Sequence, residues 1–236
     1  MIWLVLAYLF HTLGELCLSP MGLSYLSKLI PARMIAFMFG VYYLAVAIGN
    51  KLAHYIGGDI DKITEDKKKS AELDHGNKLA GDVTQEFKLE KDFMNNIGFL
   101  KFIGINISQW IQISLKQKIT KFSLIDSWIV RQFKNEYNPS HWHNGHVSGV
   151  GYLKVPSNLG ETLQKDKKVN NNGKLEMVHG SKAFLCKPTF RVTPKVGDFY
   201  FFPHYLMHAV YPFFDSDEER RSVSFNATVD QSLFNE

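Results

Sequence analysis

The sequence predicts a mainly β protein, a two-sheet jelly roll with flanking helices, preceded by a two-helix hairpin of transmembrane type. Three observations support this prediction. Residues 1–58 are strongly apolar, whereas the remainder has the composition of an ordinary soluble domain. Apolar residues then recur at helical spacing, and short segments rich in β-branched and aromatic residues follow. With 236 residues, the chain can form one catalytic domain and an appendage, but not two full enzymatic domains.

The expected hairpin, residues 1–58, contains two apolar stretches, 2–29 and 34–56. Because a helix rises about 1.5 Å per residue, each stretch can cross a hydrocarbon core of about 30 Å. A signal peptide is the alternative for the first stretch, but a second apolar stretch follows it and no basic leader precedes it. Basic residues are more numerous after the second stretch than between the two, which places the following domain in the cytoplasm. We therefore expect a membrane-anchored protein.

Part of this hairpin is similar to a known family. Residues 11–24 (HTLGELCLSPMGLS), 31–33 (PAR) and 47–50 (AIGN) resemble the late helices of proton-coupled oligopeptide transporters. Such transporters bind substrate between two halves of a larger helical bundle, which two helices cannot form. We therefore expect a transporter-like fragment without transport activity. The topology of that family would place the following domain outside, against the distribution of basic residues. The sequence therefore leaves open an inverted hairpin, a genuine fusion or an assembly artefact.

A polar linker is expected at residues 59–76, because this stretch is charged and has no apolar periodicity. The soluble domain is then expected at residues 77–236. Between residues 93 and 118, apolar residues recur every three or four positions. This spacing predicts an amphipathic helix or helix pair, broken near Gly104, that packs against a sheet.

After residue 121 the apolar pattern changes to a period of two, which is typical of strands. Short strands after helices predict a two-sheet jelly roll. We expect strands at residues 122–133, 147–155, 175–178, 189–193, 198–202, 207–211 and 220–229. The long polar loop at 156–174 has no pattern typical of a core, and it is expected to be either a mobile flap over a site or a plain surface insertion.

Three histidines form the candidate metal site. His141 and His143 lie just before a predicted strand, so that alternate residues place both imidazoles on one side. His208 lies on a late strand that can face them. Three ligands on one face of an Fe(II) ion leave positions for a bidentate 2-oxo acid and O₂. His146 is the competing candidate for the second ligand, and the usual triad has a carboxylate where this sequence has a histidine.

A candidate anion site lies on the last predicted strand. Arg220 and Ser222 share one face of this strand, whereas Arg221 takes the other face. A guanidinium donates two parallel hydrogen bonds to a carboxylate and a serine hydroxyl can donate a third, which suits the distal carboxylate of 2-oxoglutarate. The alternative is a surface ion pair with Glu218 or Glu219, for which Arg221 is the better candidate.

From about residue 75 to residue 230, the chain resembles a family of 2-oxoglutarate- and Fe(II)-dependent oxygenases of bacteria and marine phages. The resemblance implies a double-stranded β-helix with iron ligands at His141, His143 and His208 and the co-substrate carboxylate at Arg220 and Ser222. It also implies hydroxylation of an unidentified substrate with release of succinate and CO₂. The matching segments are 128–133 (WIVRQF), 136–139 (EYNP), 141–143 (HWH), 148–150 (SGV), 152–156 (YLKVP), 179–181 (HGS), 197–203 (GDFYFFP) and 220–226 (RRSVSFN).

Two other functions are compatible with these residues. A cupin-type dioxygenase binds iron with three histidines and no 2-oxo acid, but the Arg220 and Ser222 pair argues against it. A jelly-roll binding domain without catalysis is the other alternative. Nucleic acid is not an expected partner, because the net charge is only +4 and the lysines are scattered. Residues proposed to line the substrate pocket are Trp128, Arg131, Tyr137 and Tyr152.

Overall fold

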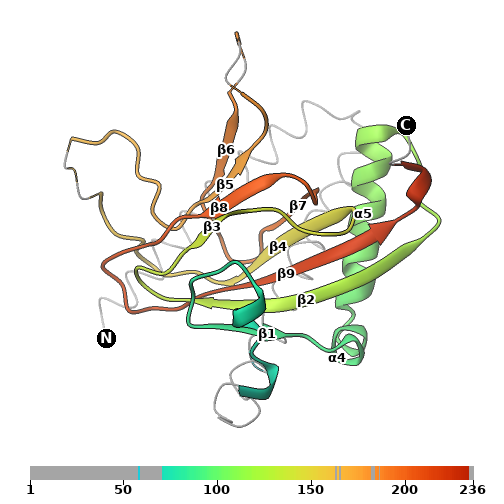
Figure 1. The fold of residues 1–236 in the computed structure, drawn as a ribbon, viewed down its shortest axis with the longest axis horizontal. Coiled ribbons are helices and arrows are strands. Elements are labelled where there is room, and N and C mark those ends of the chain that lie inside the picture. The colour runs from blue at the N-terminus through green and yellow to red at the C-terminus, as the bar shows by residue number, and fades with distance from the viewer. Residues whose placement is uncertain are drawn as a thin grey trace, which may run out of the picture. The chain divides into compact units, whose positions relative to one another are not determined.

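The computed structural model describes residue 58 and residues 71–162, 164, 166–181, 184–185 and 187–233. Within these ranges the chain forms two antiparallel sheets that face each other, with helices outside them (Figure 1). One sheet has the order β1-β2-β9-β4-β7 and the other has the order β3-β8-β5-β6. The strands of the five-stranded sheet are β1 (Gln85–Lys88), β2 (Phe122–Gln132), β9 (Arg220–Val229), β4 (Val147–Lys154) and β7 (Phe199–Pro203).

The strands of the four-stranded sheet are β3 (Asn138–His141), β8 (Met207–Val210), β5 (Leu175–Val178) and β6 (Thr189–Val192). The helices are α4 (Lys91–Asn96) and α5 (Phe99–Leu115), together with two short 3-10 helices, η2 (Gly76–Lys78) and η3 (Gln231–Leu233). All seven expected strands are present, each within one residue of its expected bounds. The predicted mainly β, double-stranded β-helix fold with flanking helices is thereby confirmed for the described residues. Strands β1 and β3 were not predicted.

Strand β9 is the middle strand of the larger sheet and pairs with β2 and β4. Successive side chains of a strand point to opposite faces. Val223 and Phe225 belong to the core that α5 covers, whereas Ser222 and Ser224 line a pocket between the sheets. The same strand therefore stabilises the fold on one face and forms the site on the other.

Helix α5 packs on the larger sheet through residues four positions apart. Phe99, Ile103, Ile107 and Ile111 are buried and belong to the same core cluster as the outward-facing residues of β2 and β9. This spacing forms one continuous apolar stripe on a helix. The prediction of an amphipathic helical region that packs against a sheet is confirmed.

The expected break near Gly104 was wrong. The helices are separated at Gly98, whose φ of +78° lies in the left-handed region that favours glycine. Gly104 lies inside α5, and a Cβ there would be 3.5 Å from the ring of Phe122, which is ordinary contact. Glycine at residue 104 is therefore compatible with the helix and does not end it.

The expectation of a membrane-anchored chain with a cytoplasmic domain is corrected here. In the described part of the chain, no helix is long and apolar enough to cross a bilayer. The longest helix of the described residues, α5, has 17 residues, and Lys101, Gln109 and Gln112 interrupt its apolar sequence. The two expected spans at residues 2–29 and 34–56 lie outside the described residues. The proposed limits of the hairpin, the linker and the soluble domain stay predictions.

The two glycines of the helical region should respond in opposite ways to alanine. We expect Gly104→Ala to stabilise the protein by about 0.5–1 kcal/mol, because alanine loses less backbone entropy in a helix interior. Gly98→Ala should destabilise it by about 1–2 kcal/mol, because a Cβ strains the left-handed conformation. Urea denaturation of the two variants tests this. A loss of stability in Gly104→Ala equal to that in Gly98→Ala would contradict the assignment of the helix break.

Candidate metal and co-substrate site

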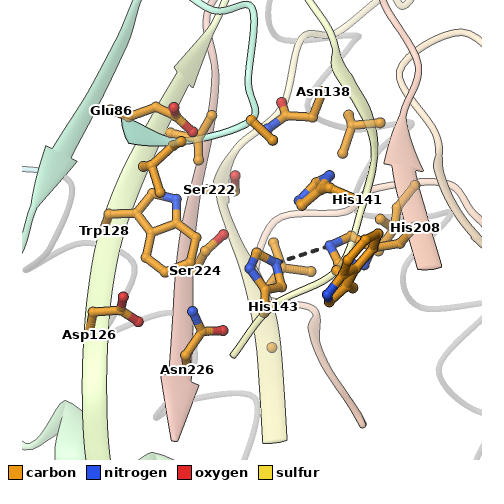
Figure 2. Close-up of a pocket in the computed structure, with 18 of the residues that line it drawn as sticks. Glu86, Asp126, Trp128, Asn138, His141, His143, His208, Ser222, Ser224 and Asn226 are labelled. Carbon is orange, nitrogen blue, oxygen red and sulfur yellow. Dashed lines mark hydrogen bonds between the residues drawn. The ribbon is translucent and has the colours of Figure 1, made fainter. Parts of the chain in front are cut away.

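The pocket between the two sheets has a volume of about 380 Å³ and contains all five residues predicted for the site. Its walls come from β1, β2, β4, β7 and β9 of the larger sheet and from β3, β5 and β8 of the smaller one. Figure 2 shows the three histidines gathered on one side of this pocket, across from β2 and β9. The five predicted residues that line it are His141, His143, His208, Arg220 and Ser222.

The three imidazoles are arranged as a metal site requires. One potential ligand atom from each of His141, His143 and His208 lies within 4.8 Å of the others. The Nε2 atoms of His143 and His208 are 3.1 Å apart, and this is the pair that the dashed line joins in Figure 2. Two nitrogens bound at right angles to one metal at about 2.1 Å are about 3 Å apart. The separation fits neighbouring ligands of a single ion.

Backbone carbonyls orient two of the rings. Nδ1 of His141 donates a hydrogen bond to the carbonyl of Pro139 at 2.7 Å, and Nδ1 of His208 donates one to the carbonyl of Leu206 at 2.8 Å. Because a carbonyl can only accept, the proton of each ring is on Nδ1 and the lone pair is on Nε2. Such a partner on the far nitrogen is common for metal-binding histidines. Both rings are therefore prepared to offer Nε2.

The histidines hold their protons weakly. Burial, together with the neighbouring charges of His208, His141 and His204, lowers the pKa of His143 to about 3. Burial lowers the pKa of His208 to about 4 and also lowers that of His141. A metal binds the neutral imidazole, so protons do not compete for these nitrogens near neutral pH. The cluster contains no carboxylate among the described residues.

The other histidines of the described residues lie outside the cluster. Nδ1 of His146, the competing candidate, accepts a hydrogen bond from the backbone N–H of Val229 at 3.1 Å. His204 lies next to the cluster and is not part of it. Its Nδ1 donates a hydrogen bond to the carbonyl of His143 at 2.9 Å, and its own carbonyl accepts one from the His143 N–H at 3.0 Å. These two bonds fix the backbone of His143. His179 is exposed.

Arg220 is a buried cation with free hydrogen-bonding capacity. Its side chain is 2% exposed, and its Nη1 donates to the carbonyl of Gly173 at 3.2 Å. Nε of Arg220 and the hydroxyl of Tyr152 have no hydrogen-bond partner among the described residues. The guanidinium carbon lies 5.4 Å from the centre of the Tyr152 ring. Since buried donors are rarely unpaired, an anion that accepts from Arg220, Tyr152 and Ser222 fits this corner of the pocket.

Arg221 does not line the pocket with Arg220, and it forms an ion pair with one of the two glutamates expected as its partner. It forms a buried ion pair with Glu219 at 2.7 Å, and Arg131 pairs with the same carboxylate at 2.7 Å. Of the residues expected to line the substrate pocket, Trp128 and Tyr152 do so, whereas Arg131 and Tyr137 do not. The described residues of the loop at 156–174 do not line it either. That observation favours a surface insertion over a flap.

Glu86 lines the same pocket and was not predicted. It lies on β1, its side chain is 0% exposed, and neither carboxylate oxygen has a hydrogen-bond partner among the described residues. Burial, together with the nearby charge of Asp74, raises the pKa of Glu86 from 4.5 to about 7. Local pattern could not identify this residue, because β1 is only four residues long and joins the site by pairing with β2.

Glu86 should make stability depend on pH. Its folded pKa is raised, so the folded state keeps a proton that the unfolded state releases, and stability is lost as pH rises from about 5 through 7. Glu86→Gln removes this loss. Between pH 5 and pH 8, the stability of this variant relative to the unaltered chain should rise by about 3 kcal/mol. Denaturant unfolding of the metal-free protein at both pH values measures it.

The exposed Glu90 provides the control for this measurement, because Glu90→Gln leaves the buried carboxyl in place. This control should follow the unaltered chain at both pH values. A constant stability difference between Glu86→Gln and the unaltered chain from pH 5 to pH 8 would show that the Glu86 carboxyl is not held in its neutral form.

Comparison with known proteins gives short matches to peptide transporters. The chain is 46% identical over 59 residues to the peptide transporter YePEPT of Yersinia enterocolitica, which is 25% of this chain and 12% of that protein. It is 44% identical over 64 residues to the uncharacterized transporter YclF of Bacillus subtilis, 27% of this chain and 13% of that protein. The chain thus spans about an eighth of the length of these curated relatives. The transporter resemblance is confined to a small part of the chain.

Three of the solved structures with a similar course of the chain are the following. A Pseudomonas putida prolyl-4-hydroxylase has a TM-score of 0.49 at 15% identity, over 75% of this chain and 86% of that one. HygX from Streptomyces hygroscopicus, with nickel and 2-oxoglutarate bound, has a TM-score of 0.45 at 12% identity, over 75% and 77%. The viral collagen prolyl hydroxylase vCPH from Paramecium Bursaria Chlorella virus-1, in a 2OG complex, has 0.43 at 13%, over 64% and 80%.

The family match falls on the site itself. Residues 126–226 match the family model described as "Putative 2OG-Fe(II) oxygenase". This segment contains the three clustered histidines and the buried Arg220 with Ser222. The predicted resemblance to this family is thereby confirmed for residues 126–226, and the cofactors that the family description implies are Fe(II) and 2-oxoglutarate. The segment that contains the candidate site is therefore similar to 2OG-Fe(II) oxygenases.

Proposed function

We propose that His141, His143 and His208 hold the Fe(II) and that Arg220, Ser222 and Tyr152 bind the distal carboxylate of 2-oxoglutarate. The convergence of three neutral imidazoles, within 4.8 Å of one another, supports the metal ligands. Beside them, the buried guanidinium and the phenol each have a free donor. Bound together, Fe(II) and 2-oxoglutarate supply an oxidation in which O₂ is consumed, 2-oxoglutarate becomes succinate and CO₂, and a substrate C–H bond is hydroxylated.

Each side chain has a distinct task in this proposal. The carbonyls of Pro139 and Leu206 keep Nε2 of His141 and His208 free of protons. Arg220 is held by Gly173 and by the ring of Tyr152, so its orientation is fixed before the co-substrate binds. A guanidinium fixed in advance loses little entropy when it binds a carboxylate. Three uncharged ligands also leave the positive charge of the ion available to an anionic co-substrate.

The two alternative functions have less support. A cupin-type dioxygenase with three histidines needs no 2-oxo acid, and the buried donors of Arg220 and Tyr152 would then have no partner. A binding domain without catalysis does not explain why two histidines are held with Nε2 deprotonated toward a common point. Both observations favour the oxygenase. The substrate would bind in the rest of the pocket, beside Trp128 and between the two sheets.

The metal assignment is tested by His208→Ala. We expect this variant to lose stoichiometric Fe(II), because the two imidazoles that remain no longer complete the three-ligand face of the ion. Iron is measured by anaerobic equilibrium dialysis and elemental analysis. The matched control is His179→Ala, which removes an exposed histidine and should bind one equivalent. Full iron content in His208→Ala would exclude His208 as a ligand.

The co-substrate assignment is tested by succinate formation from 2-oxoglutarate in the presence of Fe(II) and O₂. The unaltered chain should form succinate, and Arg220→Ala should raise the KM for 2-oxoglutarate by about 10- to 100-fold, because a charged hydrogen bond is worth about 1.5–3 kcal/mol. Arg191→Ala, which removes an exposed arginine paired with Glu176, is the control and should leave KM unchanged. No succinate from the iron-loaded chain would favour the cupin-type or the binding alternative.

A further inference from the structure

The pocket has a second polar wall, formed by Glu86, Asp126 and Trp128. Figure 2 shows these three side chains on one side of the pocket, with His141 and His208 on the other. The Trp128 ring lies 5.6 Å from the ring of His143, centre to centre, so this wall borders the histidine cluster. A group held against the wall therefore lies close to the proposed metal site.

Glu86 needs a partner that the described residues do not provide. It is fully buried, and both carboxylate oxygens lack a hydrogen bond. The nearest charge known to act on it is that of Asp74, which repels a carboxylate. Buried acceptors in proteins are nearly always satisfied, by protein, water or ligand. The carboxyl of Glu86 is therefore free to accept a donor that enters the pocket.

Space for such a donor is left by a glycine. A Cβ at Gly81 would lie 3.1 Å from Oε1 of Glu86 and 2.9 Å from Nδ2 of Asn138. Any side chain at this position would crowd both polar groups. Glycine keeps the approach to Glu86 open, as it commonly does where a ligand comes close to the backbone.

Asp126, at the other end of the wall, is a second carboxylate with an unsatisfied oxygen among the described residues. Its Oδ1 is buried and lacks a hydrogen bond, while a hydrogen bond with Asn226 engages the side chain. Trp128 is two residues further along β2, on the same face, and is 6% exposed. An aromatic ring beside carboxylates favours a cation with N–H donors, which can contact the ring and donate to the oxygens.

The charges of the pocket favour a cation over a neutral donor. Arg220 is assigned to the co-substrate, and Lys78, which also lines the pocket, is exposed and has no ion pair with Glu86 among the described residues. A hydroxyl or amide would satisfy the oxygens of the wall but would not offset the cost of ionising Glu86, whose pKa is raised by burial to about 7. A cation does both.

We propose that Glu86 and Asp126, with Trp128 between them, bind a positively charged, N–H-donating group of the substrate, so that the substrate is an amine or a guanidine. This inference rests on the proposed function, because it assigns the substrate class of the same pocket. It makes Glu86 and Asp126 specificity-determining residues that hold the substrate beside the metal and take no part in metal binding.

The test uses the full chain loaded with Fe(II) and 2-oxoglutarate without O₂, and calorimetric titration with n-butylguanidinium, n-butylammonium and the neutral n-butylurea. We expect millimolar binding of both cations and at least tenfold weaker binding of the urea. Glu86→Gln and Asp126→Asn should each weaken the cations by at least tenfold. Glu90→Gln, which changes an exposed glutamate outside the pocket, should retain the affinity.

Failure of the cations to bind, equal binding of n-butylurea, or unchanged affinity in both Glu86→Gln and Asp126→Asn would overturn the inference. Succinate formation by the unaltered chain, measured on the same preparation, separates this failure from failure of the proposed function. Succinate formation without cation binding contradicts the substrate class alone. Cation binding without succinate formation contradicts the oxygenase assignment alone.

Discussion

The antiparallel pairing of β3 with β8 is the interaction on which the site depends. In this register His141 lies directly opposite His208, at the edge of the smaller sheet. The chain leaves β3 immediately after His141, and the two hydrogen bonds with His204 then place His143 against the same pair. A shift of one residue in this pairing would turn one imidazole away from the pocket. Two separate segments of backbone, the end of β3 with the residues after it and β8, thus bring three nitrogens to one point.

The larger sheet supports this arrangement from the opposite side. Its middle strand β9 presents Arg220, Ser222 and Ser224 to the pocket, while the alternate residues pack under α5. Burial of Val223 and Phe225 therefore fixes the position of the arginine as well as the stability of the sheet. A second apolar cluster, which includes Tyr152, Leu175 and Phe202, joins the sheets beside the pocket. The co-substrate and metal residues are held by separate sheets whose spacing that cluster maintains.

Much of the β architecture could be predicted from local pattern. Alternating apolar residues are a local property, and each of the seven predicted strands is present. Strands β1 and β3 could not be found in this way. Each has four residues, and β3 contains Pro139, which cannot donate to a sheet. Their existence depends on pairing with distant strands. Glu86 was missed for the same reason, since only the pairing of β1 with β2 brings it into the pocket.

The five site residues could be predicted, and they line one pocket, because motif spacing and strand alternation are reliable over short distances. Local pattern could not decide whether His143 or His146 is the second metal ligand, since both follow β3 within five residues of its end. The structure distinguishes them by tertiary contact, because His146 turns to the backbone of Val229. Two other predictions, the position of the helix break and the membrane-anchored localisation, were wrong. Gly98 and Gly104 differ only in backbone conformation, which the apolar pattern does not contain.

In the proposed site, three imidazoles and a buried guanidinium place Fe(II) and 2-oxoglutarate in one chelate. Anaerobic titration of the full chain with both ligands, followed by visible absorption, measures whether this chelate forms. We expect a weak visible charge-transfer band that needs both ligands and saturates at one equivalent of each per chain. Absence of the band, or a band that forms with Fe(II) alone, would show that these residues do not hold the chelate.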